Sequence, residues 1–294
     1  MEFHSFDIKD KDYINSFFGE HHYEQCDCSF NTLFLWQHAY NTVWAVEDNI
    51  LFIRAGRGDM AYFMPPFEGE GASFKHGLEV IKQHLESQGK PFRLMGASPW
   101  VVEQIKNVCK HTYTFEEFRD DFEYIYKTED LIRLSGKKFR MKKNHLNSFL
   151  REYPDYVYEP ITLENMAEVK EACAAWFKRH GDIEDEMVSI QRCFDYWEEL
   201  GVKGAVIRIY GRIEAFSIGE LNDRVAHIHF EKANPEIRGL YQVINRDFIM
   251  HEFADTLFVN REEDLGIPGL RQAKMEYHPD HFAEKYNVML ASNE

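Results

Sequence analysis

Two imidazoles and a carboxylate recur at every second position of the segment VAHIHFEKA, residues 225–233. If this segment is a β-strand, alternation places His227, His229 and Glu231 on one face and the apolar residues between them on the other. A carboxylate or imidazole whose pKa burial moves toward neutrality can act as a general acid or base. His-x-His spacing also occurs in metal sites on sheets, although no third ligand is assured here. A polar strand edge without a chemical role is an equally good interpretation.

A second concentration of polar side chains follows the predicted strand TLFVN, in the segment NREEDLGIPGLRQAKMEYHP, residues 260–279. Irregular, charged backbone directly after a buried strand is where α/β folds place ligand sites. A solvated loop with surface ion pairs is the alternative. The side chains that this segment offers to a substrate are Asn260, Arg261, Glu262, Glu263, Asp264, Arg271 and Lys274.

The turn ANPEIRGLYQ, residues 233–242, leads from the strand to a predicted helix. Backbone N–H groups at a helix start, beside an arginine such as Arg238, form a site for phosphate or pyrophosphate. An Arg-Gly pair ahead of a helix more often only marks the turn between two elements. The turn by itself does not decide between the two.

The most basic stretch is GKKFRMKKNHLNSF, residues 136–149. Extended to Tyr153, it predicts an amphipathic helix with one apolar stripe and cations on both sides, among them Lys138, Lys142 and Lys143. Such a helix docks by its stripe and offers its cations to phosphates. The alternative is a connecting helix whose cations neutralise acids such as those of residues 116–123.

These residues must be positioned by alternating helices and strands, which predict an α/β (α+β) fold. The first half is expected to hold a hairpin (51–66), a helix (73–90), a strand (92–96), a helix that begins after Ser98 and a strand (122–127). The second half is expected to hold two helices (164–181, 187–201), three strands (205–210, 214–221, 225–233), a helix (239–254) and a strand (256–260). The predicted domains are residues 1–135 and 154–294, each with a mixed twisted sheet flanked by helices, joined by the basic helix 136–153.

The composition narrows the function. The 294 residues carry a formal net charge of −16, which disfavours a protein that coats nucleic acid or an anionic membrane. A local basic patch can still act, because salt screens charges more than about 8 Å apart. No segment predicts a signal peptide or a membrane-spanning helix, so a cytoplasmic location is expected. The five cysteines lack C-x-x-C spacing, which disfavours a disulfide framework and a structural zinc site.

Several enzyme classes lose their usual support. The sequence lacks the G-x-S-x-G elbow, the P-loop, the Rossmann fingerprint and the HExxH motif. These motifs are typical of serine hydrolases, nucleoside triphosphatases, dinucleotide enzymes and zincins, in that order.

Four stretches together resemble a known family. They are SFNTLFLWQHAYNT near the N-terminus, GKKFRMKKNHLNSF, EIRGLYQVINRDF and VNREEDLGIPGLRQAKMEYHP. Over essentially the whole chain the sequence is similar to soluble relatives of the phosphatidylglycerol lysyltransferase C-terminal domain. The resemblance implies two tandem acyltransferase domains of the GNAT fold, akin to Fem-type aminoacyltransferases. Characterised relatives move an aminoacyl group from a charged tRNA to an amine or hydroxyl, which in the lysyltransferase belongs to a lipid head group.

The resemblance also bears on the donor. In the GNAT pattern a Q/R-x-x-G-x-G/A loop holds the donor's pyrophosphate, and PEIRGLY keeps Gly239 but has Tyr241 in place of the second small residue. This departure disfavours ordinary coenzyme A binding and is compatible with the terminal adenosine of an aminoacyl-tRNA. No other cofactor is implied, and no metal is expected. The expected donor-binding or phosphate-binding residues are Arg238, Gly239, Tyr241, Gln242, Lys138, Lys142 and Lys143.

The first functional hypothesis is therefore an acyl or aminoacyl transferase that positions a reactive ester against a nucleophile. Backbone N–H groups of residues 229–232 would stabilise the oxyanion, and Glu231 or Asp264 would accept the proton, with His229 a further catalytic candidate. The expected acceptor-binding or anion-binding residues are Asn260, Arg261, Glu262, Arg271 and Lys274. The acceptor would be a small molecule, a peptide or a peripheral lipid, and tRNA a partner.

Two alternatives stay open. A non-catalytic module with the same double fold would bind RNA or an anionic metabolite through the basic helix. A metal enzyme would use His227 and His229 as ligands.

Overall fold

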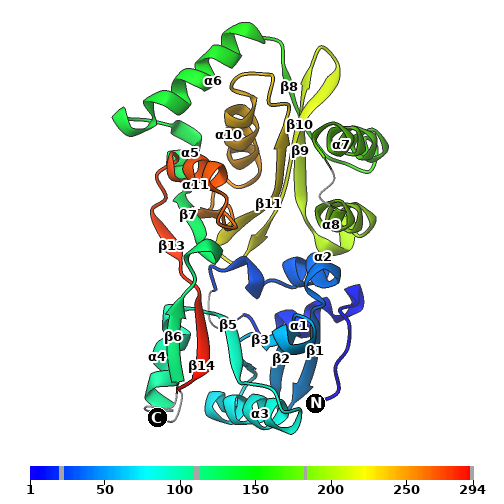
Figure 1. Cartoon of the computed structure of the whole chain (residues 1–294). Helices are drawn as coiled ribbons and strands as arrows, with labels where there is room; N and C mark the ends of the chain where they lie inside the picture. The colour runs from blue at the N-terminus through cyan, green and yellow to red at the C-terminus, as the bar shows by residue number, and fades with distance from the viewer. Residues whose placement is uncertain (20–22, 109–112, 182–183, 292–294) are drawn as a thin grey trace. The chain divides into compact units, whose positions relative to one another are not determined.

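The computed structural model describes residues 1–19, 23–108, 113–181 and 184–291, which divide into two compact units (Figure 1). One unit contains Met1–Phe122 with Ala283–Glu294, and the other is Glu123–Phe282. The predicted boundaries at residues 135 and 154 do not coincide with these bounds. Residues 123–135 carry a strand and a helix of the second unit, whereas the last strand of the chain belongs to the sheet of the first.

The first unit is built on a mixed sheet in the order β1-β2-β3-β5-β14-β6, with β4 paired to β2 and with β3 and β5 parallel. The predicted hairpin is confirmed by the antiparallel pairing of β2 with β3. The strands are β1 (Val43–Glu47), β2 (Ile50–Ala55), β3 (Tyr62–Phe63), β4 (Phe67–Glu68), β5 (Arg93–Ala97), β6 (Tyr113–Glu117) and β14 (Tyr286–Leu290). The α-helices are α1 (Lys11–Asn15), α2 (Phe30–Tyr40), α3 (Phe74–Ser87) and α4 (Pro99–Val108), with 3-10 turns at Ile8–Asp10, Cys26–Cys28, Gly58–Met60 and Arg119–Asp121.

Two of these helices carry the core of the first unit. Helix α3 begins after Ser73, whose hydroxyl accepts the His76 N–H, and buries Leu78, Ile81 and Leu85 at helical spacing. Helix α4 begins at Pro99, and the Ser98 hydroxyl accepts a backbone N–H of its first turn. Both helices pack their apolar stripes in one cluster with the sheet. The predicted positions of these helices are confirmed.

The second unit has a mixed sheet in the order β13-β7-β12-β11-β10-β9-β8, in which β11 and β12 are parallel. The strands are β7 (Glu123–Lys127), β8 (Val157–Pro160), β9 (Lys203–Ile209), β10 (Arg212–Asn222), β11 (Val225–Ala233), β12 (Phe258–Asn260) and β13 (His281–Ala283). The helices are α5 (Thr128–Arg133), α6 (Arg140–Glu152) after the 3-10 turn Lys137–Phe139, α7 (Met166–His180), α8 (Glu184–Asp195), α9 (Trp197–Leu200), α10 (Leu240–Glu252) and α11 (Pro268–Met275). The single helix predicted over 187–201 is interrupted at Tyr196.

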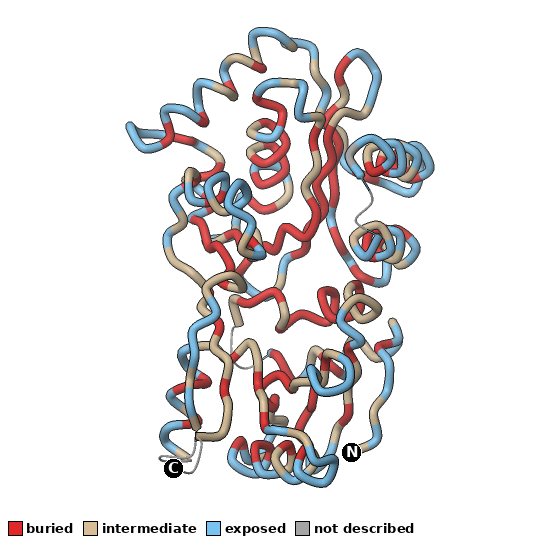
Figure 2. Tube along the Cα trace, in the orientation of Figure 1, coloured by how far each residue is buried: buried red, intermediate tan, exposed pale blue. Residues whose placement is uncertain are grey.

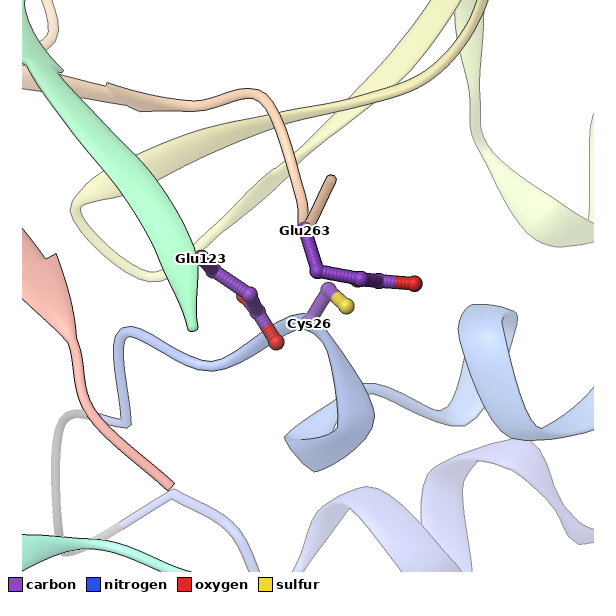
Figure 3. Close-up of side chains that lie close together, drawn as sticks. All are labelled: Cys26, Glu123 and Glu263. Carbon is purple, nitrogen blue, oxygen red and sulfur yellow. The ribbon is translucent and has the colours of Figure 1, made fainter. Parts of the chain in front are cut away.

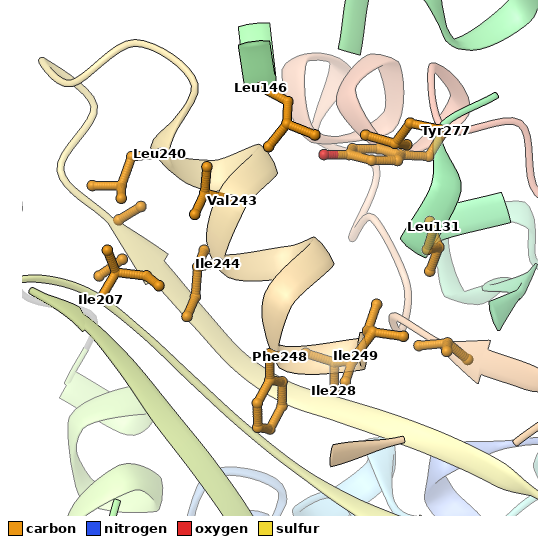
Figure 4. Packing of buried hydrophobic residues seen from close by; sticks show 14 of the residues in the cluster. Leu131, Leu146, Ile207, Ile228, Leu240, Val243, Ile244, Phe248, Ile249 and Tyr277 are labelled. Carbon is orange, nitrogen blue, oxygen red and sulfur yellow. The ribbon is translucent and has the colours of Figure 1, made fainter. Parts of the chain in front are cut away.

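Helix α10 forms the centre of the larger core (Figure 4). Its residues Leu240, Val243, Ile244, Phe248 and Ile249 are fully buried against the sheet and against α5 and α6. Helices α7 and α8 cover the other face of this sheet (Figure 1). Strand β11 is buried along almost its whole length between these layers (Figure 2). None of the helices in the described part of the chain is long and apolar enough to cross a bilayer.

Strand β11 contains a β-bulge that the sequence did not reveal. Ile218 of β10 lies opposite Phe230, but the next residue, Gly219, lies opposite Ile228, so His229 is an extra residue. A side chain at Gly219 would not fit, because its Cβ would lie 2.4 Å from the His227 carbonyl oxygen. The bulge reverses the alternation of side chains beyond it.

The prediction that Glu231 shares a face with the two histidines is therefore wrong. Glu231 instead accepts a hydrogen bond from Asn245 of α10, and the neighbouring Ala233 packs in the α10 core together with Ile228. Lys232 points to the opposite side, where it pairs with Glu186 of α8 at 2.7 Å. The α10 face thus takes even-numbered residues before the bulge and odd-numbered residues after it.

Candidate functional site

The parallel strands β11 and β12 stay together for only three residues. Val225, Ala226 and His227 pair with Phe258–Asn260, after which the chain leaves β12 as an irregular loop. Residues 228–233 continue along β10, and the pairing with β12 does not extend to them within the described part of the chain. One edge of β11 is therefore released from backbone pairing beyond the bulge, and polar side chains gather beside it.

Glu231 belongs to this edge, and its two carboxylate oxygens have different hydrogen-bond partners. Its Oε1 accepts from Arg261 Nη2 at 2.8 Å, and its Oε2 accepts from Asn245 Nδ2 at 3.1 Å. The Arg261 guanidinium also lies over the ring of Tyr277, 4.9 Å from its centroid. Burial raises the pKa of Tyr277 to about 12 despite this neighbouring positive charge. The structure thus brings Glu231 and Arg261 together as a buried ion pair.

The loop that carries Arg261 is held by Lys274 of α11. The Lys274 ammonium donates to the carbonyl oxygens of Arg261 at 2.6 Å, of Glu262 at 3.1 Å and of Glu263. Burial, and then the charge of Arg261, lower the pKa of Lys274. An ammonium has three N–H donors, and all three are occupied by backbone. Lys274 therefore shapes the loop, and it has no donor left for the anion that the sequence analysis assigned to it.

The Asp264 carboxylate, like the Lys274 ammonium, is already hydrogen-bonded within the protein. Its carboxylate accepts two hydrogen bonds from Arg271, at 2.7 and 2.8 Å, one from the Tyr124 hydroxyl and one from the Gly266 N–H at 2.9 Å. Burial opposes ionisation of this carboxyl, but the bonds to Arg271, Tyr124 and Gly266 dominate and hold its pKa at about 2. A carboxylate this acidic is a poor base. The predicted proton-accepting role of Asp264 and the anion-binding role of Arg271 are thus disfavoured.

His229, the bulge residue, lies between two carboxylates. Its Nδ1 is 2.9 Å from Glu262 Oε1 and its Nε2 is 3.1 Å from Glu220 Oε1. Burial alone would lower the pKa of His229, but these two carboxylates raise it to about 10. The ring is therefore protonated at neutral pH. A protonated imidazole has no lone pair to take a proton or to bind a metal, which argues against His229 as a base and against a His227–His229 metal pair.

Asn260, the last residue of β12, joins the loop that follows it to β7. Its Nδ2 donates to the carboxylate of Glu123, while its Oδ1 accepts the Glu262 N–H at 2.6 Å. Figure 3 shows Glu123 at the start of β7 and Glu263 in the loop that follows β12. Glu123 was not among the predicted site residues, although a glutamate inside an apolar strand is a detectable signal of a buried polar contact.

Three further residues of the cluster were missed. Glu220 stands at the end of an apolar strand, where it could have been noticed for the same reason. Asn245 and Tyr277 lie within helical or irregular segments and have no sequence signal that separates them from surface residues. Only the fold brings them to Glu231 and Arg261.

The basic helix was correctly predicted as amphipathic. Phe139, Leu146 and Phe149 are buried in the α10 core. Lys142, which was expected at the exposed flank, is buried instead and pairs with Glu276 at 2.8 Å. This contact lowers the pKa of Glu276.

The cations of this helix differ in what they can still offer to a ligand. Lys138 pairs with Asp130 at 2.9 Å, so Asp130 and Glu276 are the acids that pair with lysines of this helix among the residues of the second unit that the structure describes. Lys143 is exposed and forms no ion pair with any residue that the structure describes. Of the three lysines singled out from the sequence, Lys143 is the one available to a phosphate.

The start of α10 packs closely against the backbone of α6. Gly239 has a φ of 88°, and a Cβ there would lie 2.3 Å from the His145 carbonyl oxygen of α6. The glycine is therefore required by close backbone packing. Arg238 is exposed beside this contact, and its charge helps burial lower the pKa of His145. Backbone of α6 thus occupies the space next to Gly239 where a pyrophosphate was expected.

Two further predicted donor residues, Tyr241 and Gln242, contact Ala233 of β11 and Tyr277, in that order. Burial raises the pKa of Tyr241, and a hydrogen bond from the Ala233 backbone N–H opposes that rise. Gln242 hydrogen-bonds the Tyr277 hydroxyl and so opposes the rise in the pKa of Tyr277. Both residues thus belong to the polar cluster around Glu231.

A shallow groove opens on the α7 face of the same strand. It is lined by Trp176 and Arg179 of α7, Glu214 of β10, and Lys232 and Asn234. Asn234 donates to Glu214 at 2.9 Å. The groove and the Glu231 cluster flank the end of β11 from opposite faces.

Comparison with known proteins gives a consistent result. Residues 20–289 match the family described as "Phosphatidylglycerol lysyltransferase, C-terminal". A conserved protein of unknown function from Bacteroides thetaiotaomicron is 32% identical, with a TM-score of 0.91 over 99% of this chain and 100% of that one. The structure of L-PGS from Bacillus licheniformis is 16% identical, with a TM-score of 0.66 over 96% and 92% of the two chains.

Two further relatives extend the comparison. The crystal structure of FemX is 8% identical, with a TM-score of 0.59 over 98% and 97% of the chains, and shares the fold. An uncharacterised protein of Mycoplasmoides gallisepticum is 22% identical over 170 residues, which are 56% of this chain. The match spans 55% of that relative, about half its length. The two mixed sheets and these similarities establish the tandem GNAT-like fold that the sequence predicted.

Proposed function

The chain belongs to the phosphatidylglycerol lysyltransferase C-terminal family, and from this membership and the site we propose that it is an aminoacyltransferase. The observation that carries the proposal is the separation of β11 from β12 beside the buried Glu231–Arg261 pair. This separation leaves an edge of β11 next to a cluster of charged side chains. The donor in this proposal is an aminoacyl-tRNA, and the acceptor is an amine or hydroxyl.

The reaction needs little from the protein beyond positioning and electrostatics. The acceptor's lone pair attacks the ester carbonyl, a new C–N or C–O bond forms, and the bond from that carbon to the ribose oxygen breaks. The acceptor's proton ends on the departing ribose oxygen. N–H groups on the released edge of β11, within residues 229–232, are positioned to stabilise the oxyanion, and Glu231 relays the proton.

Two features favour a tRNA ester over an acyl-coenzyme A. The backbone of α6 fills the space beside Gly239 where a pyrophosphate would lie, and Tyr241 replaces the second small residue of the phosphate loop. Lys143 and Arg238 remain exposed nearby for the phosphates of an RNA strand. The groove beside Trp176 and Lys232 offers the acceptor an approach from the opposite face of β11.

The direct test is transfer of label from total tRNA charged with radioactive amino acids. We expect label to move to an added acceptor when lipid, peptide and amine mixtures are supplied in turn. Glu231→Gln keeps a hydrogen-bond acceptor for Arg261 but cannot relay the proton, so transfer should fall by roughly 10²-fold or more. Transfer at the wild-type rate by a folded Glu231→Gln variant would contradict the role of Glu231. Retention of charged tRNA without any transfer would indicate a binding module.

Two lysines of α6 provide a matched test of RNA binding. Lys143→Gln should weaken tRNA binding and reduce the slope of log affinity against log salt by about 1, because an exposed phosphate contact is lost. Lys142→Gln should lower the melting temperature and leave the slope unchanged, since its ammonium is engaged with Glu276. Filter binding over a salt series measures both. An identical slope for the wild type and Lys143→Gln would exclude Lys143 from the RNA contact.

A further inference from the structure

Two buried polar atoms of the Glu231 cluster are left over after its internal bonds are made. Asn245 Nδ2 and Arg261 Nη2 both donate to Glu231, at 3.1 and 2.8 Å. Asn245 Oδ1 and Arg261 Nη1 are also buried, and neither has a hydrogen-bond partner within the part of the chain that the structure describes. Buried polar atoms in native proteins ordinarily have a partner, which here must come from a ligand or water.

The chemistry of the missing partner is constrained. A carboxylate only accepts, so the Asn245 amide must turn its Nδ2 toward Glu231 and its Oδ1 away. The Oδ1 atom therefore needs a donor. Arg261 Nη1 can only donate and therefore needs an acceptor. The complementary group presents both an N–H or O–H and an oxygen.

We propose that this cluster recognises the α-ammonium and the ester carbonyl of an aminoacyl donor, an inference that rests on the proposed function. The ammonium donates to Asn245 Oδ1 and to the Glu231 carboxylate, and the carbonyl oxygen accepts from Arg261 Nη1. A plain acyl group has no ammonium and leaves Asn245 Oδ1 unsatisfied. The site therefore selects aminoacyl esters over simple acyl esters, as buried polar groups do when a ligand cannot pair with them.

The local charge favours a cationic guest. In and around the loop after β12, carboxylates outnumber the cationic side chains, so an added positive charge is attracted. The carboxylates are Glu123, Glu220, Glu231, Glu262, Glu263 and Asp264, and the cations are His229, Arg261, Arg271 and Lys274.

A single ordered water is the simplest competing occupant. Water can donate to Asn245 Oδ1 and accept from Arg261 Nη1 at once. It would satisfy both atoms without selecting any donor. The two possibilities differ in whether the α-amine of a ligand contributes to affinity.

The experiment is calorimetric titration of the full chain with hydrolysis-resistant analogues of the tRNA terminus. The probes are 3'-amino-3'-deoxyadenosine carrying alanine or lysine in amide linkage, and the matched propionyl and 6-aminohexanoyl amides that lack the α-amine. We expect the α-amine to increase affinity for the wild type by roughly 10- to 100-fold, as a charge-assisted hydrogen bond in a buried site does. Asn245→Leu should weaken this preference, because only the Glu231 carboxylate is then left for the ammonium, and should leave the affinity for the propionyl amide unchanged.

Each result decides between defined outcomes. Equal binding of the aminoacyl and deamino analogues to the wild type would overturn the inference and point to a bound water only, leaving the transferase proposal intact. A preference that survives undiminished in a folded Asn245→Leu variant would place amine recognition elsewhere and overturn the assignment. Binding of no analogue, together with no transfer from charged tRNA, would remove the proposed function and this inference with it. If Asn245→Leu does not fold, the comparison of analogues on the wild type still decides.

Discussion

Arg261→Met should lower the free energy of unfolding by about 3–5 kcal/mol, because it leaves Glu231 as an uncompensated charge in a buried site. The Arg261 and Glu231 side chains are only 14% and 9% exposed. The guanidinium also packs on Tyr126 and Tyr277, so its removal costs contact area as well as charge. Urea unfolding followed by circular dichroism measures the loss, and transfer activity should vanish with it.

Two companion variants separate charge from packing. Arg261→Met combined with Glu231→Leu removes both charges and should recover much of the lost stability, although not the activity. Arg133→Met makes the same substitution in an ion pair with Glu129 whose side chains are both 68% exposed, and it should cost less than about 1 kcal/mol. Equal losses for Arg261→Met and Arg133→Met would show that the Glu231 pair is not buried in solution.

Hydrophobic periodicity was enough to predict most helices and strands. Leu78, Ile81 and Leu85 of α3 and the apolar stripe of α6 are buried as expected, because a helical repeat of apolar residues leaves one face to pack. The division of the chain into two units was harder to predict from the sequence. It depends on β7 and β14 joining sheets whose other strands are distant in sequence, and no local pattern encodes such pairing.

The site was only partly predictable, for two physical reasons. Strict alternation placed Glu231 beside His229, but the bulge opposite Gly219 moved it to the α10 face, and a bulge is determined by pairing between strands. Charge alone also marked Lys274 and Lys142 as available to anions. A lysine that folds inward to a carbonyl cage or a single carboxylate has the same sequence signature as an exposed one.

The pH dependence of stability should report directly on His229. Because its pKa in the folded protein, about 10, is raised above the ordinary value of 6.5, its contribution to stability is fully present below pH 6.5. That contribution declines as the pH rises through 10. The shift corresponds to roughly 5 kcal/mol at most. Wild-type stability from urea unfolding should therefore fall across this window relative to His229→Gln, which keeps hydrogen-bonding groups but has no charge to lose.

Comparison of variants isolates this effect from other titrations. Cysteine, tyrosine and lysine residues that ionise at high pH are common to both proteins, so the difference between wild type and His229→Gln reflects position 229. His251→Gln replaces an exposed histidine of α10 and should reproduce the wild-type profile. A difference between wild type and His229→Gln that stays constant from pH 6.5 to 10 would mean that the ring is not held protonated. The Glu220–His229–Glu262 bridge would then lack the charge that fixes the bulge of β11 to the loop carrying Arg261.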